Sequence, residues 1–259
     1  MNWFLEQSID YANQHTYLDE LFRVYPTIPN NIKNINQEIW NKVEVAYKEK
    51  NKRDLVENLL KLELFPMKDS YVAYLRKDKT ALDRNQKTVE RIALEVLDMQ
   101  LDSIYQKCSE PKETNRQIGP MFKNWSTSGV LGFPVMEKDA FMSCSNDAIL
   151  KADDNDMKAI AHELVGYNID KGLDFVARIH QKYVIGEAKF LSDLGEHQNT
   201  QFNDAVHLFS SKAAAIKVAI LDGVVYIKNK GKMYEQLMKH YKNQNVMSAL
   251  LLRSFLYSI

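Results

Sequence analysis

The sequence predicts an α/β protein in which a mixed β-sheet core is flanked by helices and preceded by a largely helical N-terminal region. Apolar residues recur every three or four positions through most of residues 1–110, which is the period of a helix with one buried face. Residues 173–179 and 183–189 instead alternate in polarity, and this period of two indicates β-strands. A second pair of strands is expected at residues 216–221 and 224–227, because Asp-Gly between them is a strong hairpin signal.

Several helical segments are expected in the N-terminal region. They cover residues 3–11, 18–24, 32–50, 55–62, 69–75 and 88–106. Pro26 and Pro29 end the second segment, and Asp54 can cap the fourth. The segment at residues 88–106 has the clearest apolar stripe, so we expect one continuous helix there with its stripe in the core.

Residues 109–134 form the main irregular stretch, because prolines and glycines that interrupt regular structure gather there. These are Pro111, Gly119, Pro120, Gly129, Gly132 and Pro134. We therefore divide the chain into a helical N-terminal region at residues 1–134 and a core with the C-terminal helices at residues 135–259. Both are expected to pack as one compact unit, since the chain is long for one domain and short for two.

Helices are also expected between and after the strands of the core. Asp153 can cap a helix that reaches Val165, and another helix follows the polar loop after Lys189. Two helices close the chain. The last, around residues 246–257, is apolar nearly all round, so we expect it to be buried either in the core or in a dimer interface.

Composition excludes several classes of protein. The chain carries 34 basic and 34 acidic side chains, so its net charge gives no global sign of nucleic-acid binding, and phosphate contacts would have to come from local patches. Two cysteines are too few for a disulfide framework or a zinc site. The N-terminus lacks the pattern of a signal peptide, and no apolar run has the length of a membrane span. We therefore expect a cytoplasmic protein with no membrane partner.

The register of the hairpin at residues 173–189 decides which side chains meet. If residues 180–181 form a two-residue turn, Asp174 lies opposite Glu187 on one face of the sheet, and Lys189 projects from the same face. A slip of one residue would send Asp174 to the other face. Two carboxylates in direct opposition repel, so a fold tolerates them best with a cation between them. Two hard oxygen ligands suit Mg²⁺, which also accepts phosphate oxygens.

This group of residues resembles the active site of the PD-(D/E)XK nuclease superfamily, and within it the type II restriction endonucleases. The matching residues are Asp174, Glu187, Ala188 and Lys189, and Leu173 stands where the family name has proline. The resemblance implies that Asp174 and Glu187 hold Mg²⁺ together with the carbonyl of Ala188. It also implies that Lys189 positions or deprotonates the attacking water.

The resemblance extends over most of residues 64–227. It includes the segments FPMKDSYVAYLRKD, NQKTVERI and SEPKETNRQIGPMFKNW, which are similar to the N-terminal half of some type II restriction endonucleases. Many members of the superfamily carry a further acid on the helix before the metal-binding strands, which makes Glu163 an additional candidate catalytic residue. A half-buried structural role for Glu163 is the alternative.

The resemblance implies a restriction-endonuclease-like fold and Mg²⁺-dependent, sequence-specific hydrolysis of phosphodiester bonds in double-stranded DNA. It also implies a homodimer, 5′-phosphate ends, a cognate DNA methyltransferase as functional partner and a prokaryotic cytoplasm. Three alternatives stay open. They are a structure- or damage-specific DNA nuclease of the same superfamily, a non-catalytic DNA-binding protein that keeps the fold, and a helical interaction protein with no nucleic-acid role.

Basic residues in two local clusters are candidates for contact with DNA phosphates. The clusters are Arg76, Lys77, Lys79, Arg84, Lys87 and Arg91, and then Lys107, Lys112, Arg116 and Lys123. Gln198 and Gln201 are further candidates. Both lie in the first turns of the helix that follows the hairpin at residues 173–189, and the start of a helix favours phosphate binding. The selected DNA-binding candidates are Arg84, Lys87, Arg116, Lys123, Gln198 and Gln201. Acidic residues are interspersed, so a solvated surface of mixed charge is the alternative.

Overall fold

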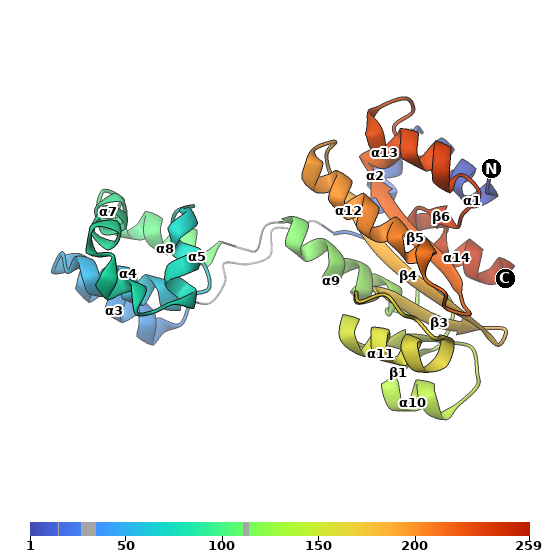
Figure 1. The fold of residues 1–259 in the computed structure, drawn as a ribbon, viewed down its shortest axis with the longest axis horizontal. Coiled ribbons are helices and arrows are strands. Elements are labelled where there is room, and N and C mark those ends of the chain that lie inside the picture. The colour runs from blue at the N-terminus through green and yellow to red at the C-terminus, as the bar shows by residue number, and fades with distance from the viewer. Residues whose placement is uncertain (15, 27–34, 111–113) are drawn as a thin grey trace. The chain divides into compact units, whose positions relative to one another are not determined.

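The chain forms two compact units, each with its own apolar core (Figure 1). The computed structural model describes residues 1–14, 16–26, 35–110 and 114–259. The sheet unit consists of Met1–Thr27 and Glu113–Ile259, and the helical unit consists of Ile28–Lys112.

This division differs from the sequence prediction, which put the boundary at residue 134 and expected one compact unit. Helices α1 (Trp3–Ala12), α2 (Tyr17–Leu21) and α9 (Thr114–Ser126) belong to the sheet unit. The reason is packing, because buried residues of all three helices share one apolar cluster with the strands. Sequence periodicity shows that a helix has a buried face, but not which core that face joins.

The described part of the helical unit, residues 35–110, contains six helices around two apolar clusters. They are α3 (Gln37–Lys48), α4 (Lys52–Lys61), α5 (Ser70–Lys77), α6 (Ala81–Arg84), α7 (Gln86–Leu97) and α8 (Leu101–Ser109). The prediction of a single helix at residues 88–106 is wrong, because α7 ends at Leu97 and the backbone of Gln100 is extended. Its apolar stripe nevertheless continues across the break, because Val96 and Ile104 lie in the same cluster. Pro29 and residues 32–34 lie outside the described residues.

The described residues of the sheet unit form a mixed sheet of six strands in the order β1-β2-β3-β4-β5-β6, which confirms the predicted α/β class. The strands are β1 (Val135–Glu137), β2 (Ala148–Lys151), β3 (Phe175–Ile179), β4 (Lys182–Leu191), β5 (Ile216–Gly223) and β6 (Val246–Met247). Strand β3 is antiparallel to β2 and β4, whereas the pairs β1–β2, β4–β5 and β5–β6 are parallel.

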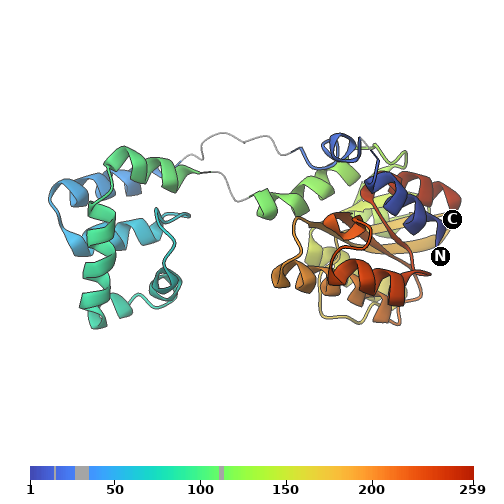
Figure 2. The ribbon, with the colours of Figure 1, turned by 90° about the horizontal axis from the view of Figure 1, so that it is seen from above.

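Helices cover both faces of this sheet (Figures 1 and 2). Apolar residues of α10 (Lys138–Ser143) and α11 (Asp154–Val165) form one cluster with Val176 and Ile185. Helices α12 (Glu196–Val206), α13 (Gly231–Gln236) and α14 (Ala249–Ser258) join α1, α2 and α9 in the cluster on the opposite face. Burial on both faces explains why apolar side chains occur on both sides of β3 and β4. A 3₁₀ turn, His207–Ser210, follows α12, and a π-helical turn, Leu237–Tyr241, continues α13.

The hairpin predicted at Asp222-Gly223 does not form. Strand β5 ends at Gly223, and a 3₁₀ turn, Val224–Tyr226, follows in place of a returning strand. Gly223 has a φ of 93°, and a Cβ atom there would lie 2.2 Å from the carbonyl oxygen of Leu191. Only glycine allows the chain to leave the sheet so close to β4.

The hairpin formed by β3 and β4 has the predicted register. Ile179 pairs with Lys182, and the two residues between them are His180 and Gln181, with φ values of 47° and 63°. Positive φ at both central positions matches the twist of a tight two-residue hairpin. With this register Asp174 lies opposite Glu187, as the sequence predicted.

The last helix, α14, is mainly part of the core. Leu252, Phe255 and Leu256 on this helix are buried in the same cluster as the sheet, while Tyr257 is exposed. Burial within the chain therefore accounts for most of the apolar pattern that also suggested a dimer interface. Among the described residues, no helix combines the length and apolar character needed to cross a membrane.

Candidate active site

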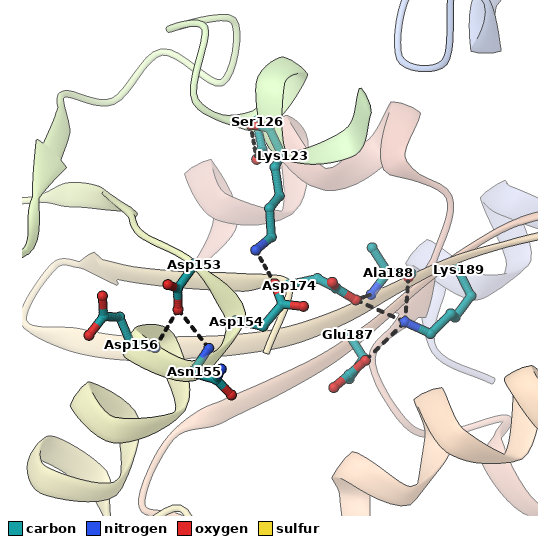
Figure 3. Close-up of polar contacts among 10 residues, drawn as sticks. All are labelled: Lys123, Ser126, Asp153, Asp154, Asn155, Asp156, Asp174, Glu187, Ala188 and Lys189. Atoms are coloured by element: carbon teal, nitrogen blue, oxygen red, sulfur yellow. Dashed lines mark hydrogen bonds and ion pairs between the residues drawn. The ribbon is translucent and has the colours of Figure 1, made fainter. Parts of the chain in front are cut away.

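The two carboxylates predicted to bind metal lie opposite each other in the hairpin. Asp174 directly precedes β3, and Glu187 lies in the middle of β4. The backbone N–H of Asp174 donates to the carbonyl of Gly186 at 3.1 Å, which aligns Asp174 with Glu187 across the hairpin. Both side chains point to the same face as Val176 and Ile185, since strand residues alternate between faces. Figure 3 shows both side chains beside the ammonium group of Lys189.

Lys189 supplies the cation that this opposition requires. Its Nζ atom lies 3.0 Å from Oδ2 of Asp174 and 3.2 Å from Oε2 of Glu187. The same ammonium donates to the carbonyl oxygen of Ala188 at 3.0 Å, and the N–H of Ala188 donates to Oδ2 of Asp174 at 2.9 Å. The four residues that carry the family resemblance thus form one connected network (Figure 3).

Burial and neighbouring charges shift the pKa values of Glu187 and Lys189 in this network. The side chain of Glu187 is only 2% exposed, and desolvation raises the pKa of its carboxyl to about 7, with nearby Lys189 opposing the shift. Burial alone would lower the pKa of Lys189, but the charges of Asp174 and Glu187 raise it above its usual range. Lys189 therefore keeps its proton in this arrangement and acts as a hydrogen-bond donor.

One oxygen of the site has no partner. Oε1 of Glu187 is buried and accepts no hydrogen bond in the described structure. A buried, unpaired carboxylate oxygen is costly, and a hard cation would satisfy it. The described residues contain no group of three His, Cys, Asp or Glu side chains suited to a metal. The ligands that this site offers a metal are the carboxylates of Asp174 and Glu187 and the carbonyl of Ala188, all of which the Lys189 network brings together.

A second lysine, which the sequence did not single out, reaches the same carboxylate. Nζ of Lys171 lies 3.9 Å from Oε2 of Glu187 and 3.4 Å from Oδ2 of Asp204, which α12 supplies. Lys171 precedes the hairpin in a loop, and Asp204 follows it on a helix. No local pattern in the sequence relates the two, so only the fold reveals their proximity.

Lys123, one of the predicted DNA-binding residues, lies on α9 beside the start of α11. Its ammonium pairs with Asp154, the first residue of α11 (Figure 3). Asp154 adjoins the segment that leads into β3, because its Cβ lies 2.6 Å from the place that a Cβ of Gly172 would take. Lys123 thus stands on the flank of the carboxylate site.

The other predicted residues have varied positions. Glu163 is exposed on α11, away from the buried face of that helix, and the structure does not join it to the carboxylate network. Gln198 is buried, and its side-chain oxygen and nitrogen bond to Ser192, so it secures the loop after β4. Gln201 bonds to the ring of His197.

The remaining candidates lie elsewhere. Arg84 and Lys87 are exposed in the helical unit, where Arg84 pairs with Asp78. The side chain of Arg116 and all of Lys112 lie outside the described part of the chain. Asp170, the neighbouring acid, is exposed and pairs with Lys158, so it is not part of the network.

Comparisons with known proteins agree with the geometry of the hairpin. A family model described as the Tsp45I type II restriction enzyme matches residues 2–259. Searches of curated proteins and of solved structures found no match.

Proposed function

The chain belongs to the Tsp45I type II restriction enzyme family, and on that premise we propose that Asp174, Glu187 and Lys189 carry out Mg²⁺-dependent hydrolysis of DNA phosphodiester bonds. Membership makes the protein a site-specific endonuclease. One observation supports this assignment of residues. The ammonium group of Lys189 donates hydrogen bonds to both Asp174 and Glu187, and the other oxygen of Glu187 is buried without a partner among the described residues.

The donor set fits Mg²⁺ by its chemistry. Asp174 and Glu187 offer carboxylate oxygens, and Ala188 offers a carbonyl, all of which are hard ligands. Oε1 of Glu187 is available to coordinate, since no donor among the described residues bonds to it. When bound, Mg²⁺ supplies a Lewis acid beside the scissile phosphate. A type II enzyme of this family is expected to depend on a divalent ion, and Mg²⁺ is the one that we assign.

The residues of the chain perform the remaining tasks. Lys189 holds its proton and donates, so it orients the attacking water and stabilises negative charge as it develops on the phosphate. Asp174 fixes the backbone of Ala188 through the N–H that it accepts, which holds the adjacent carbonyl in place. Glu187 is restrained by its burial in β4, so its position is set before substrate binds.

We assign contacts with DNA to basic residues of both units. Lys123 stands beside the catalytic hairpin and is suited to a phosphate near the cleaved bond. Lys87 is exposed on α7, and Arg84 is held by Asp78 at the preceding turn. Arg116 and Gln201 complete the assignment, whereas burial of Gln198 gives it a supporting role.

Cleavage of both strands at a short site suggests a homodimer, because one chain supplies one carboxylate hairpin and the two DNA strands are antiparallel. A cognate DNA methyltransferase would protect the host DNA from such an enzyme in the cytoplasm of a prokaryotic cell.

Digestion of a plasmid of known sequence tests the proposal. Purified protein with MgCl₂ is expected to give a reproducible set of discrete fragments, and EDTA is expected to abolish them. Glu187→Gln, which keeps the shape of the side chain but not its charge, should leave the plasmid uncut. Undiminished cleavage in EDTA would contradict the metal site, and a continuous smear would contradict the specificity of the reaction.

A further inference from the structure

The two oxygens of Glu187 have different surroundings. Oε2 faces two ammonium groups, since Nζ of Lys189 lies at 3.2 Å and Nζ of Lys171 at 3.9 Å. Oε1 is buried and has no hydrogen-bond partner among the described residues. The proposed metal therefore has one free oxygen of Glu187 available, while positive charge of the protein already lies at the other.

The ammonium of Lys171 is in an unusual position for a lysine. Its Nζ atom is buried and makes no hydrogen bond in the described structure, although an ammonium has three donors. It lies between Glu187 and Asp204, at 3.9 Å and 3.4 Å from their nearest oxygens. A desolvated cation without hydrogen bonds is retained by the charges around it, and here these are two carboxylates from different elements.

Two carboxylates that lie within 4 Å of one cation resemble the ligands of a metal ion. In enzymes with two metal ions, the ions lie about 3.5–4 Å apart and share carboxylate ligands. The position of the Lys171 ammonium, within 4 Å of both Oε2 of Glu187 and Oδ2 of Asp204, is where a second ion would find such ligands. Lys171 holds a positive charge at that position without any metal.

We propose that Lys171 occupies the second cation position of the site, so that each chain binds a single divalent ion. This inference rests on the proposed metal-binding role of Asp174 and Glu187. The charges agree with it, because three carboxylates face two ammonium groups and leave one net negative charge. One divalent ion more than neutralises that charge, and a second ion would enter a site that is already positive. Lys171 is thus a positioning residue, and Asp204 is its counterion.

Counting bound Mn²⁺ ions tests this inference on the full chain. Electron paramagnetic resonance measures free Mn²⁺ in a titration, and the bound number follows by difference. The native protein is expected to bind one ion per chain at this site. Lys171→Ala removes both the charge and the volume of the side chain, so it should raise the number to two. Lys171→Arg restores a cation and should return it to one.

Two variants complete the design. Lys158→Ala removes a half-buried lysine of α11 that pairs with Asp170 near the same loop, so it should leave one ion bound. Lys171→Ser replaces Lys171→Ala if the alanine variant does not fold. In Glu187→Gln the site ion should be lost, which identifies the ion that is counted.

The outcomes separate the two claims. Two ions in the native protein, or one ion in Lys171→Ala, would overturn the role of Lys171 and leave the proposed metal site intact. A native protein that binds no ion, or a count that Glu187→Gln does not change, would overturn the metal site and the inference with it.

Discussion

Nζ of Lys189 lies 3.0 Å from Oδ2 of Asp174, the residue that directly precedes β3. The contact exists only because the hairpin turn contains two residues, since a shift of one position would turn Asp174 to the other face. The lysine thereby holds an aspartate from the neighbouring strand and a glutamate from its own. Catalysis by this arrangement should depend on each member of the set.

Substitution of the three residues is the direct test. Asp174→Ala, Glu187→Ala and Lys189→Ala should each lower the single-turnover cleavage rate by about 100-fold or more, as loss of electrostatic stabilisation usually does. Glu187→Gln is the gentler variant at the buried position, because alanine would leave two ammonium groups beside an empty space. Glu137→Gln, at an exposed ion pair with Lys151, is the control and should cleave normally. Full activity in Asp174→Ala would show that another acid serves the metal.

Much of this site could be predicted because its geometry is local. Period-two alternation on either side of a two-residue gap sets the register, and the register sets which side chains face each other. Lys171 and Asp204 could not be found in this way. They belong to a loop and a helix that come together only when α12 packs against the sheet, and neither stands in a pattern that distinguishes it from an ordinary surface residue.

Local signals also misled in places. Asp222-Gly223 has the composition of a hairpin turn, yet Asp222 is fully buried at the end of β5. It accepts hydrogen bonds from Tyr17, Tyr25 and Ser248, which stand at distant positions in the chain. The Asp-Gly dipeptide alone does not indicate that Asp222 has these hydrogen-bond partners. The same limit applies to the helical segment at residues 88–106, where a continuous apolar stripe spans two helices.

The hydrogen bonds to Asp222 should stabilise the sheet unit. Tyr25 donates to Oδ2 of Asp222 at 2.9 Å, inside the core. Tyr25→Phe should lower the free energy of unfolding by about 1.5–3 kcal/mol, because it removes a donor from a buried charged group. Calorimetry on the full chain measures the effect. Tyr257→Phe, at an exposed tyrosine of the same unit, is the matched control, and an equal loss there would contradict a special role for Tyr25.

The same carboxylate should make stability depend on pH. Burial raises the pKa of Asp222 from 3.8 to about 6, although its hydrogen bonds oppose the shift. Between these values the folded state holds more protons than the unfolded state, so the contribution of Asp222 to stability is complete below pH 4 and is lost as pH rises through 6. The difference in unfolding free energy between the native protein and Asp222→Asn should therefore shrink by about 1 kcal/mol from pH 5 to pH 7. A constant difference would show that the folded-state pKa is not raised.

Binding to DNA should weaken steeply with salt despite the zero net charge. The exposed lysines of the helical unit, Lys87 among them, are the groups that would release counterions from phosphate. Lys87→Ala should weaken binding on all sequences alike and reduce the salt slope by about 1. Lys48→Ala on α3, at an exposed pair with Glu44, is the control. If the DNA affinity of the native protein did not change with salt concentration, the basic clusters would not be in contact with DNA.

The number of chains on the DNA is the last expectation. Each chain supplies one carboxylate hairpin, and cleavage of both strands at one site requires two cuts in opposite directions. A two-fold axis relating two chains matches the symmetry of a palindromic site. Because α14 is mostly buried within the chain, the contact between chains should lie on other surfaces of the protein. Light scattering of the protein on a duplex that contains its site should give the mass of two chains per duplex. A complex of one chain per duplex that still cuts both strands would contradict the dimer.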